Sequence, residues 1–373
     1  MTSPRVRDSG GSGARLHLGD RVVRKTADAG GLDKLSSEGQ WLQWIRRTGG
    51  PDVARHFPRV LRLPTGDHPE LVLERVPGTD ARGLVLAGRA DETGPLVERA
   101  TRFAFGVVAG LPSAPTRASP AAWCARHLRT SLSAATRRYP ELTTLLAMPR
   151  LVMHDCALPN PLYGRAERAM ARLRRADPAR IRVIHGDLHL GNMVVAPDRG
   201  SFHLVDPRGG WDGRRHFDPA YDIAKLLHEP HYVAARSGRA RVRLGTRAGG
   251  VLVTADAAPT PTLDGMADLA VVSRRLASFG CRTRLFDDPL IAARATMLTG
   301  VLLLSPLRLD SIGAEEWETL LGHALCWLAA GAHAVDQGLG LGRCEALWDA
   351  LLSHMVPDAW AGSSIGRWLD HDC

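Results

Sequence analysis

Lysine is nearly missing from this sequence. Of the 48 basic residues among 373, only Lys25, Lys34 and Lys225 are lysines, and all the others are arginines. With its many alanines and glycines, this bias indicates genome composition rather than function. Because arginine cannot replace a compact ammonium group at every site, each retained lysine is a candidate for a specific role.

Long apolar runs and paired cysteines are also missing. The longest apolar segment, Met297 to Leu307, is interrupted by Thr299, Ser305 and Pro306, and no run reaches the roughly 18–20 residues of a membrane helix. The first 13 residues lack the apolar stretch of a signal peptide. The six cysteines form no C-x-x-C pair, which argues against zinc ribbons and disulfide scaffolds. We therefore expect a cytoplasmic protein with no membrane partner.

The formal charge of +9 raises the question of nucleic acid binding. The densest basic run is Arg165 to Arg182, and no aromatic side chains are interspersed in it as a base-stacking platform would require. The run is typical of a solvated helix face, and we expect no nucleic acid partner. The sequence does not indicate an oligomeric state.

Strand patterns dominate the first 77 residues and helical patterns dominate the remainder. Two strands joined by a turn are predicted over 14–27, a helix over 32–47, and two more strands over 59–63 and 71–76. Later strands are confined to residues 181–205 and to a hairpin over 241–254. This pattern predicts an α+β protein with a small sheet lobe containing one helix (1–77) and a larger, mostly helical lobe (78–373).

The strongest local signal is the segment HGDLHLGN at residues 185–192, which lies between short apolar strands. Asp187 and Asn192 fall in this loop, and Asp206 ends the strand that comes after the next turn. Phosphoryl transfer needs one aspartate to orient the attacking hydroxyl, and an asparagine with a second aspartate to hold Mg²⁺ on nucleotide phosphates. The spacing matches the catalytic and metal-binding loops of kinases. The alternative is an ordinary polar turn.

Lys25 ends the second predicted strand, where a kinase-type site has a lysine that pairs with nucleotide phosphates. A helix glutamate should hold that lysine, and Glu38 lies in the predicted helix, with Gln40 as a fallback. Period-two alternation puts Arg24 and Lys25 on opposite faces of the strand, so either one can point at phosphate. The scarcity of lysine favours Lys25.

Two more segments are candidates for nucleotide contacts. The Gly/Ser-rich residues 9–13, with Ser12 among them, can form a loop over the phosphates or simply a mobile terminus. Residues Glu74 to Val76 lie where the lobes should join, and their backbone would meet the nucleotide base. An edge strand that leaves the sheet would use the same residues.

These segments resemble the aminoglycoside phosphotransferase and choline kinase-like superfamily, whose fold is similar to that of protein kinases. HGDLHLGN matches the catalytic loop of that superfamily, LVDPRG at 204–209 stands at its metal-binding aspartate, and FDPAYDIAKL at 217–226 matches the helix that follows. The form of the last two motifs is closer to uncharacterised or polysaccharide-biosynthesis-associated members than to resistance enzymes.

The resemblance implies a protein kinase-like, two-lobed fold, with nucleotide binding in residues 1–77 and catalysis and acceptor binding in 78–373. It implies Mg²⁺ as cofactor and ATP or GTP as phosphate donor. It also implies that Asp187 is the catalytic base, with His185 and Asp222 supporting the catalytic loop. The other implied roles are Mg²⁺ binding by Asn192 and Asp206, phosphate contact by Lys25, and orientation of that lysine by Glu38.

The predicted function is therefore transfer of the γ-phosphate to a hydroxyl of a sugar, amino sugar or aminoglycoside-like natural product. Aminoglycosides are polycations, and the net charge of +9 favours a neutral or anionic acceptor instead. The alternative is a non-catalytic pseudokinase that binds nucleotide or another ligand, which the complete set of site residues disfavours. A protein kinase is disfavoured by the missing A-P-E signature. For Arg208, contact with phosphate, contact with an anionic acceptor and a surface salt bridge all stay open, and a set of carboxylates is left as weak acceptor-site candidates: Asp310, Glu315, Glu316, Glu318 and Asp336.

Overall fold

The structure is a computed structural model that describes residues 5–8, 14–27, 31–66, 68–112, 119–153, 156–173, 181–198, 200–208, 215–238, 241–247, 249–256, 264–283, 286, 288–309 and 311–353. The chain packs into two compact units, Met1–Thr116 with Ile181–Asp222, and Arg117–Arg180 with Ile223–Cys373. This division differs from the predicted boundary between residues 77 and 78, because 78–116 and 181–222 pack with the N-terminal sheet. The division into nucleotide-binding and acceptor-binding lobes stays a prediction.

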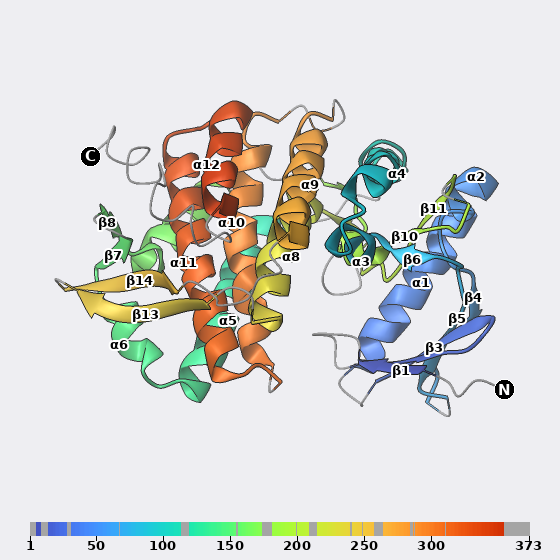
Figure 1. Ribbon diagram of the computed structural model, residues 1–373, viewed down its shortest axis with the longest axis horizontal. Coiled ribbons are helices and arrows are strands. Elements are labelled where there is room, and N and C mark those ends of the chain that lie inside the picture. The colour runs from blue at the N-terminus through green and yellow to red at the C-terminus, as the bar shows by residue number, and fades with distance from the viewer. Residues whose placement is uncertain are drawn as a thin grey trace. The chain divides into compact units, whose positions relative to one another are not determined.

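The first unit is built on a five-stranded antiparallel sheet (Figure 1). Its strands are β1 (Arg5–Asp8), β2 (Ala14–Leu18), β3 (Val22–Ala27), β4 (Val60–Arg62) and β5 (Glu70–Glu74), in the order β1-β2-β3-β5-β4. Helix α1 (Leu32–Thr48) packs on this sheet, and its buried apolar residues include Leu35, Trp41, Leu42 and Ile45. The strands and the helix predicted for this part of the chain are confirmed.

Short elements complete the first unit. They are α2 (Gly50–Ala54), β6 (Thr79–Asp80), α3 (Ala81–Leu86), α4 (Ala90–Arg102), a π-helix (Phe103–Val108), β9 (Arg182–Val183), β10 (Met193–Val195), β11 (Phe202–Leu204) and β12 (His216–Phe217). Strand β10 pairs with both β6 and β11, and β9 pairs with β12. Met193 lies opposite Leu204, and the Val205 N–H donates to the Asn192 carbonyl at 3.0 Å. This register brings Asn192 beside the chain that leads into Asp206.

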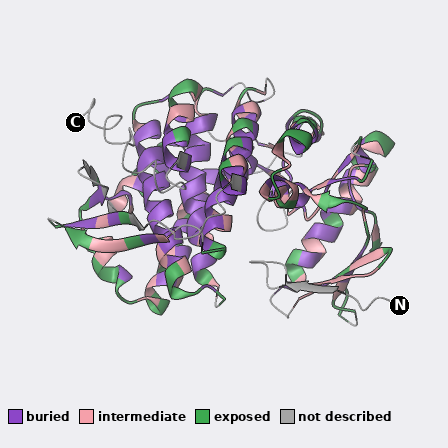
Figure 2. Ribbon diagram, in the orientation of Figure 1, coloured by how far each residue is buried: buried purple, intermediate pink, exposed green. Residues whose placement is uncertain are grey.

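The second unit is mostly helical. Its helices are α5 (Pro120–Arg138), α6 (Leu142–Ala147), α7 (Ala166–Leu173), α8 (Ala220–Arg236), α9 (Asp264–Cys281), α10 (Ile291–Leu304), α11 (Ala314–Asp336) and α12 (Leu341–Ser353). The start of α8, as far as Asp222, belongs to the first unit. Helix α11 packs along α10, and nearly all residues of both helices are buried (Figure 2). They form the core of the unit.

A four-stranded sheet lies beside α11 in the second unit (Figure 1). Its strands are β7 (Arg150–Met153), β8 (Cys156–Pro159), β13 (Arg241–Arg247) and β14 (Gly250–Asp256), in the order β13-β14-β7-β8. The hairpin of β13 and β14 was predicted. The β7–β8 pair was not.

The segment Ile291–Arg308 is long and apolar enough to cross a membrane by length and composition, so the prediction that no segment reaches this length is wrong. It is 89% buried inside the structure, as the core helix of a compact unit would be. Arg294 interrupts the apolar sequence, and it is buried as well, with Asp288 as its ion-pair partner. Burial in the core of the second unit therefore explains the apolar composition of this segment.

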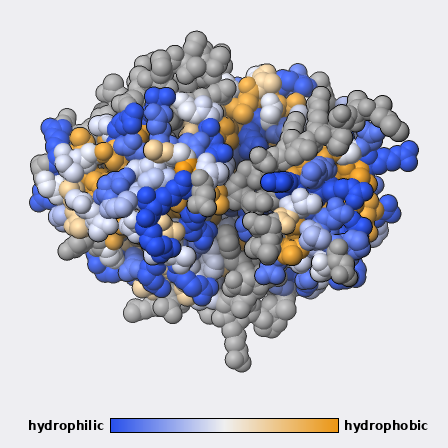
Figure 3. Space-filling view, turned by 90° about the horizontal axis from the view of Figure 1, so that it is seen from below, coloured by the Kyte–Doolittle hydropathy of each residue, from blue (hydrophilic) through white to orange (hydrophobic). Residues whose placement is uncertain are grey.

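Polar and apolar side chains are intermixed on the face of the molecule drawn in Figure 3. In the part of the chain that the structure describes, the large hydrophobic residues that stay exposed are Leu61, Val107 and Val271. They come from different elements, and single exposed apolar residues of this kind do not indicate a binding surface.

Candidate functional site

Lys25 lies between two carboxylates in the first unit. Its Nζ donates to Glu38 Oε1 at 2.6 Å and to Asp206 Oδ1 at 2.9 Å, and the residue is only 8% exposed. Strand β3 positions the lysine, α1 positions Glu38, and the end of β11 positions Asp206. Arg24 points elsewhere, since it is exposed and pairs with Glu70 at 3.2 Å. The structure thus separates the two candidates that strand alternation left open, and it brings Lys25 to the acidic residues.

The charges of this group depend on one another. Burial would lower the pKa of Lys25, but attraction to Asp206 and then to Glu38 outweighs burial and raises it. Burial would likewise raise the pKa of Asp206, yet the cations of Lys25 and Arg208 hold it well below its usual range. For Glu38 burial wins over the opposing pull of Lys25 and raises the pKa to about 8. Lys25 and Asp206 are therefore the firmly charged members of the group.

Asp206 also has an unusual backbone. Its φ of 57° lies in the left-handed region, and no other non-glycine residue in the described part of the chain has a positive φ. Such a conformation costs of order 1–3 kcal/mol and persists only where the surroundings hold it. The contacts with Lys25 and with the end of the β10–β11 ladder supply that restraint.

The loop of residues 185–192 is held by Asp222 at the start of α8. One carboxylate oxygen accepts from the His185 N–H and the other from the Gly186 N–H, both at 2.8 Å. Gly186 has a φ of 81°, which a side chain would strain, so the glycine allows the turn that precedes Asp187. Burial raises the pKa of Asp222 to about 7, against the backbone N–H groups that favour its charged form. Asp222 has the loop-supporting position that the resemblance implied.

The carboxylate of Asp187 is almost covered, with its side chain 4% exposed. Arg208 Nε lies 3.0 Å from Oδ2, and His189 Nε2 lies 3.7 Å from Oδ1. Arg208 Nη2 is also 4.0 Å from Asp206 Oδ2. Arg208 therefore lies beside both Asp187 and Asp206. The sequence had left the partners of Arg208 open.

Asn192 and Asp206 provide donors that suit Mg²⁺. The Asn192 Nδ2 donates to the Asp187 carbonyl at 2.9 Å, which leaves the amide oxygen as the atom able to face a cation. Among the residues that the structure describes, no three His, Cys, Asp or Glu side chains gather into a metal site. Magnesium is usually held by one or two carboxylates together with substrate phosphates, so a small oxygen-donor set fits it.

His185 is buried away from solvent, 1% exposed, with its ring edge-on to Trp41 at 6.2 Å. Burial lowers its pKa to about 4, so the ring is neutral near pH 7. Trp41 in turn donates to the Ile184 carbonyl at 3.2 Å. These contacts make His185 a support of the loop, and its predicted part in catalysis stays a prediction.

The remaining predicted nucleotide contacts are less defined. Ser12 lies outside the described residues. The N–H groups of Glu74 and Arg75 donate to the carbonyls of Arg59 and Arg21, so they are used inside the unit. The Glu74 side chain is exposed, and contact of the Glu74–Val76 backbone with a nucleotide base stays a prediction.

Arg82 was missed by sequence reasoning. Its guanidinium packs so closely on Gly191 of the catalytic loop that a Cβ at position 191 would lie 2.9 Å from Cζ. In a sequence where nearly every basic residue is arginine, nothing marked this residue out. A methyl group at position 191 would therefore require the end of the flexible Arg82 side chain to move.

The acidic residues considered for the acceptor have partners within the second unit. Glu315 pairs with Arg241 of β13 at 3.4 Å, and Glu316 pairs with Arg236 of α8 at 3.0 Å. Glu318 pairs with Arg243 of β13 at 3.2 Å. Asp336 pairs with Arg165, which precedes α7, at 3.4 Å and with Arg172 of α7 at 2.5 Å. Asp310 lies outside the described residues. These contacts give the carboxylates a structural role.

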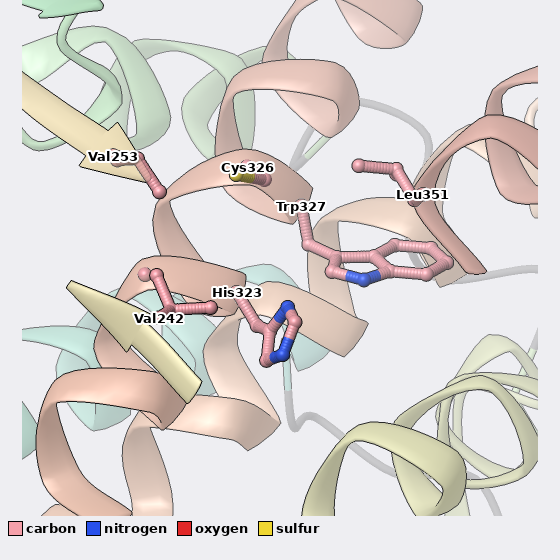
Figure 4. A pocket seen from close by; sticks show the side chains of 7 residues that line it. Val242, Val253, His323, Cys326, Trp327 and Leu351 are labelled. Atoms are coloured by element: carbon pink, nitrogen blue, oxygen red, sulfur yellow. The ribbon is translucent and has the colours of Figure 1, made fainter. Parts of the chain in front are cut away.

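Figure 4 shows a pocket in the second unit, away from the predicted site residues in the sequence. His323 and Trp327 line it, and Trp327 donates to the buried His231 at 2.9 Å. The rings of His231 and His323 lie 4.4 Å apart. Burial lowers the pKa of His323 to about 4, so this imidazole is neutral near pH 7. The other lining residues are mainly apolar: Val242, Val253, Gly322, Cys326 and Leu351.

Comparison with known proteins finds a matching family model and similar solved structures. A family model described as "Phosphotransferase enzyme family" matches residues 5–269. No curated protein sequence matches the chain. Among solved structures, the ADP-bound aminoglycoside phosphotransferase APH(2'')-Ib is similar with a TM-score of 0.51 and 9% identity, over 87% of this chain and 92% of that one. This similarity concerns the fold alone, and it confirms the predicted α+β, protein kinase-like, two-lobed class.

Two other solved structures are similar at lower scores. The aminoglycoside phosphotransferase APH(3'')-Id from Streptomyces rimosus, in complex with ADP and streptomycin, has a TM-score of 0.40 and 16% identity, over 81% of this chain and 95% of that one. A glucosamine kinase in complex with glucosamine, ADP and inorganic phosphate has a TM-score of 0.41 and 19% identity, over 96% of this chain and 77% of that one.

Proposed function

Because the chain belongs to the phosphotransferase enzyme family, we propose that it is a small-molecule kinase that transfers the γ-phosphate of ATP or GTP to a hydroxyl group. One observation carries the proposal: Lys25, from strand β3, contacts both Glu38 and Asp206 within 3 Å. Asp206 lies 181 positions from Lys25 and Glu38 lies 13. A lysine held by a glutamate, next to an aspartate that can bind Mg²⁺, is the set of groups that phosphoryl transfer uses.

The proposed mechanism assigns a separate task to each residue. Asp187 orients the acceptor hydroxyl and takes its proton as the new P–O bond forms. Lys25 neutralises charge on the nucleotide phosphates, with Glu38 fixing its direction. Asn192 and Asp206 would hold Mg²⁺, which when bound offsets phosphate charge. Catalysis of this kind consists mainly of positioning and electrostatic stabilisation.

We propose a sugar, amino sugar or related natural product as the acceptor. The net charge of +9 favours a neutral or anionic molecule over a polycationic aminoglycoside. The internal pairing of Glu315, Glu316, Glu318 and Asp336 supports the same choice, because these carboxylates already neutralise arginines.

The proposal is tested by Asp187→Asn. Nucleotide turnover is measured with Mg²⁺ and ATP or GTP against a panel of hydroxylated acceptors, and Mg²⁺-nucleotide affinity is measured by thermal shift. Loss of a general base typically costs about 10²–10⁴ in rate, so we expect acceptor-dependent turnover to fall by at least that order while nucleotide affinity is retained.

Asp91→Asn is the matched control, since Asp91 is an exposed aspartate in the first turn of α4. It should leave both measurements unchanged. Equal turnover by wild type and Asp187→Asn would remove Asp187 from the mechanism. Nucleotide binding without any turnover in the wild type would favour the pseudokinase alternative.

A further inference from the structure

Arg208 occupies a defined place between the two aspartates of the site. It follows Asp206 by two residues, and its backbone N–H donates to the His185 carbonyl at 2.8 Å. Its side chain reaches Asp187 at 3.0 Å and approaches Asp206 at 4.0 Å. A main-chain contact and side-chain contacts thus fix the residue against the catalytic loop. Nearly every basic residue of this chain is arginine, so the position of Arg208, and not its residue type, distinguishes it.

Among the described residues, the Arg208 guanidinium and the Lys25 ammonium both place positive charge beside the two aspartates. Lys25 contacts Asp206, and Arg208 contacts Asp187 and lies near Asp206. Burial would lower the pKa of Arg208, but attraction to Asp187 and then to Asp206 raises it, so the group keeps its charge. Its side chain is 31% exposed, in contrast to the 4% of Asp187. Arg208 therefore presents charge outward from a covered carboxylate.

In the proposed reaction the transferred phosphoryl group passes close to the Arg208 guanidinium. The bond between the γ-phosphorus and the β-phosphate oxygen breaks, and its electron pair stays with the nucleoside diphosphate. A bond forms between that phosphorus and the acceptor oxygen, whose proton goes to Asp187. The phosphoryl group moves between the nucleotide side, near Asp206, and the acceptor side, at Asp187, and charge spreads over its equatorial oxygens.

We infer that Arg208 is a further catalytic residue, whose guanidinium contacts the transferred phosphoryl group. This inference rests on the proposed function. The Nε–H is directed at Asp187, and the planar fork carries four other N–H donors, so one side chain can contact the carboxylate and phosphoryl oxygens together. The role resembles that of an arginine supplied to the transition state, here from the same chain.

The test compares Arg208→Ala, Arg208→Gln and Arg208→Lys with the wild type. Affinity is measured by titration calorimetry for Mg²⁺ with ADP, and again with aluminium fluoride added as a mimic of the transferred phosphoryl group. Basal ATP hydrolysis gives the rate, with water as acceptor. We expect Mg²⁺-ADP affinity to change by less than about threefold in all variants, while aluminium fluoride no longer tightens ADP binding to Arg208→Ala or Arg208→Gln.

The hydrolysis rate should fall by about 10²–10³-fold in these two variants, as for the loss of a single preorganised donor. Arg208→Lys should recover part of both effects, because it restores charge without the fork. The control is Arg89→Ala, which removes an exposed arginine of the same unit that pairs with Glu92 at 3.0 Å. It should leave every measurement unchanged. Melting temperatures of the unliganded variants verify folding, and Arg208→Gln serves if the alanine variant does not fold.

The inference is overturned if aluminium fluoride tightens ADP binding as much in Arg208→Gln as in the wild type, or if it adds nothing in the wild type. Arg208 would then only pair with Asp187. A wild type that does not bind Mg²⁺-ADP at all would instead overturn the proposed function, so the two failures are distinguishable.

Discussion

At the scale of single residues, the three lysines have different surroundings. Lys25 is buried between carboxylates, Lys34 is exposed on α1, and Lys225 lies half-buried on α8. Lys225 is close enough to His127 to help lower the pKa of that buried imidazole, after the larger effects of burial and of Arg308. The position of Lys25 alone combines burial with contacts to two residues of the proposed site.

We predict that Lys25→Met weakens Mg²⁺-ATP binding by at least about tenfold and also lowers the melting temperature. The substitution leaves Glu38 and Asp206 without their shared cation, and breaking a buried pair typically costs about 3–5 kcal/mol. Affinity by calorimetry and thermal denaturation measure the two effects. Lys34→Met, which removes a lysine from an exposed position of the same unit, should change neither. Unaltered nucleotide affinity in Lys25→Met would exclude a phosphate contact by this lysine.

At the scale of secondary-structure elements, helices α10 and α11 approach each other through glycines. A Cβ on Gly331 would lie 2.6 Å from the Met297 Cα, and one on Gly300 would lie 2.8 Å from the Leu328 backbone nitrogen. Backbone atoms cannot rotate away as side chains can. The close packing of these two core helices therefore depends on the absence of side chains at both positions.

We predict that Gly331→Ala destabilises the protein by roughly 1–3 kcal/mol, because the added methyl group overpacks the contact between the helices. Urea denaturation measures the change. Gly342→Ala is the matched control, since Gly342 lies in α12 with nothing within 4 Å of its added Cβ. That change should be neutral or stabilising by up to about 1 kcal/mol, as alanine is the better helix former. Equal effects of the two substitutions would contradict the close approach of α10 and α11.

At the scale of the whole molecule, stability should depend on pH through buried imidazoles such as His323. In the unfolded chain this group takes up a proton below about pH 6.5, whereas in the folded protein it does so only near pH 4. Between these values the unfolded state binds more protons, so the free energy of unfolding falls as the pH falls. The titratable group that faces it is His231 of α8, with ring centroids 4.4 Å apart.

We predict that His323→Gln makes the stability less sensitive to acid. One group with this shift contributes a slope of up to about 1.4 kcal/mol per pH unit, which the variant should lose between pH 6.5 and 4. Melting temperatures across that range measure it, relative to His68→Gln at an exposed turn position. Parallel curves for wild type and His323→Gln would show that the buried ring does not carry this dependence.

Sequence alone predicted the candidate catalytic loop, the metal-site candidates and most of the longer elements. Asp187 and Asn192 lie in one short loop, where sequence spacing is close to spatial arrangement, and α1 and the β13–β14 hairpin have clear periodicity. The fold class followed from the same patterns. Strands of two residues such as β6 and β12 were not predicted, because two residues are too few to show an alternating pattern.

Only the tertiary structure decided how the distant parts of the site meet. Lys25 and Asp206 are 181 positions apart, and their contact depends on the packing of β3, α1 and the β10–β11 ladder. The same packing brings Lys25, and not Arg24, to the carboxylates of Glu38 and Asp206. It also places Arg208 beside Asp187. Local patterns specify which groups are present and on which element, whereas the partners of a charge depend on which elements are buried together.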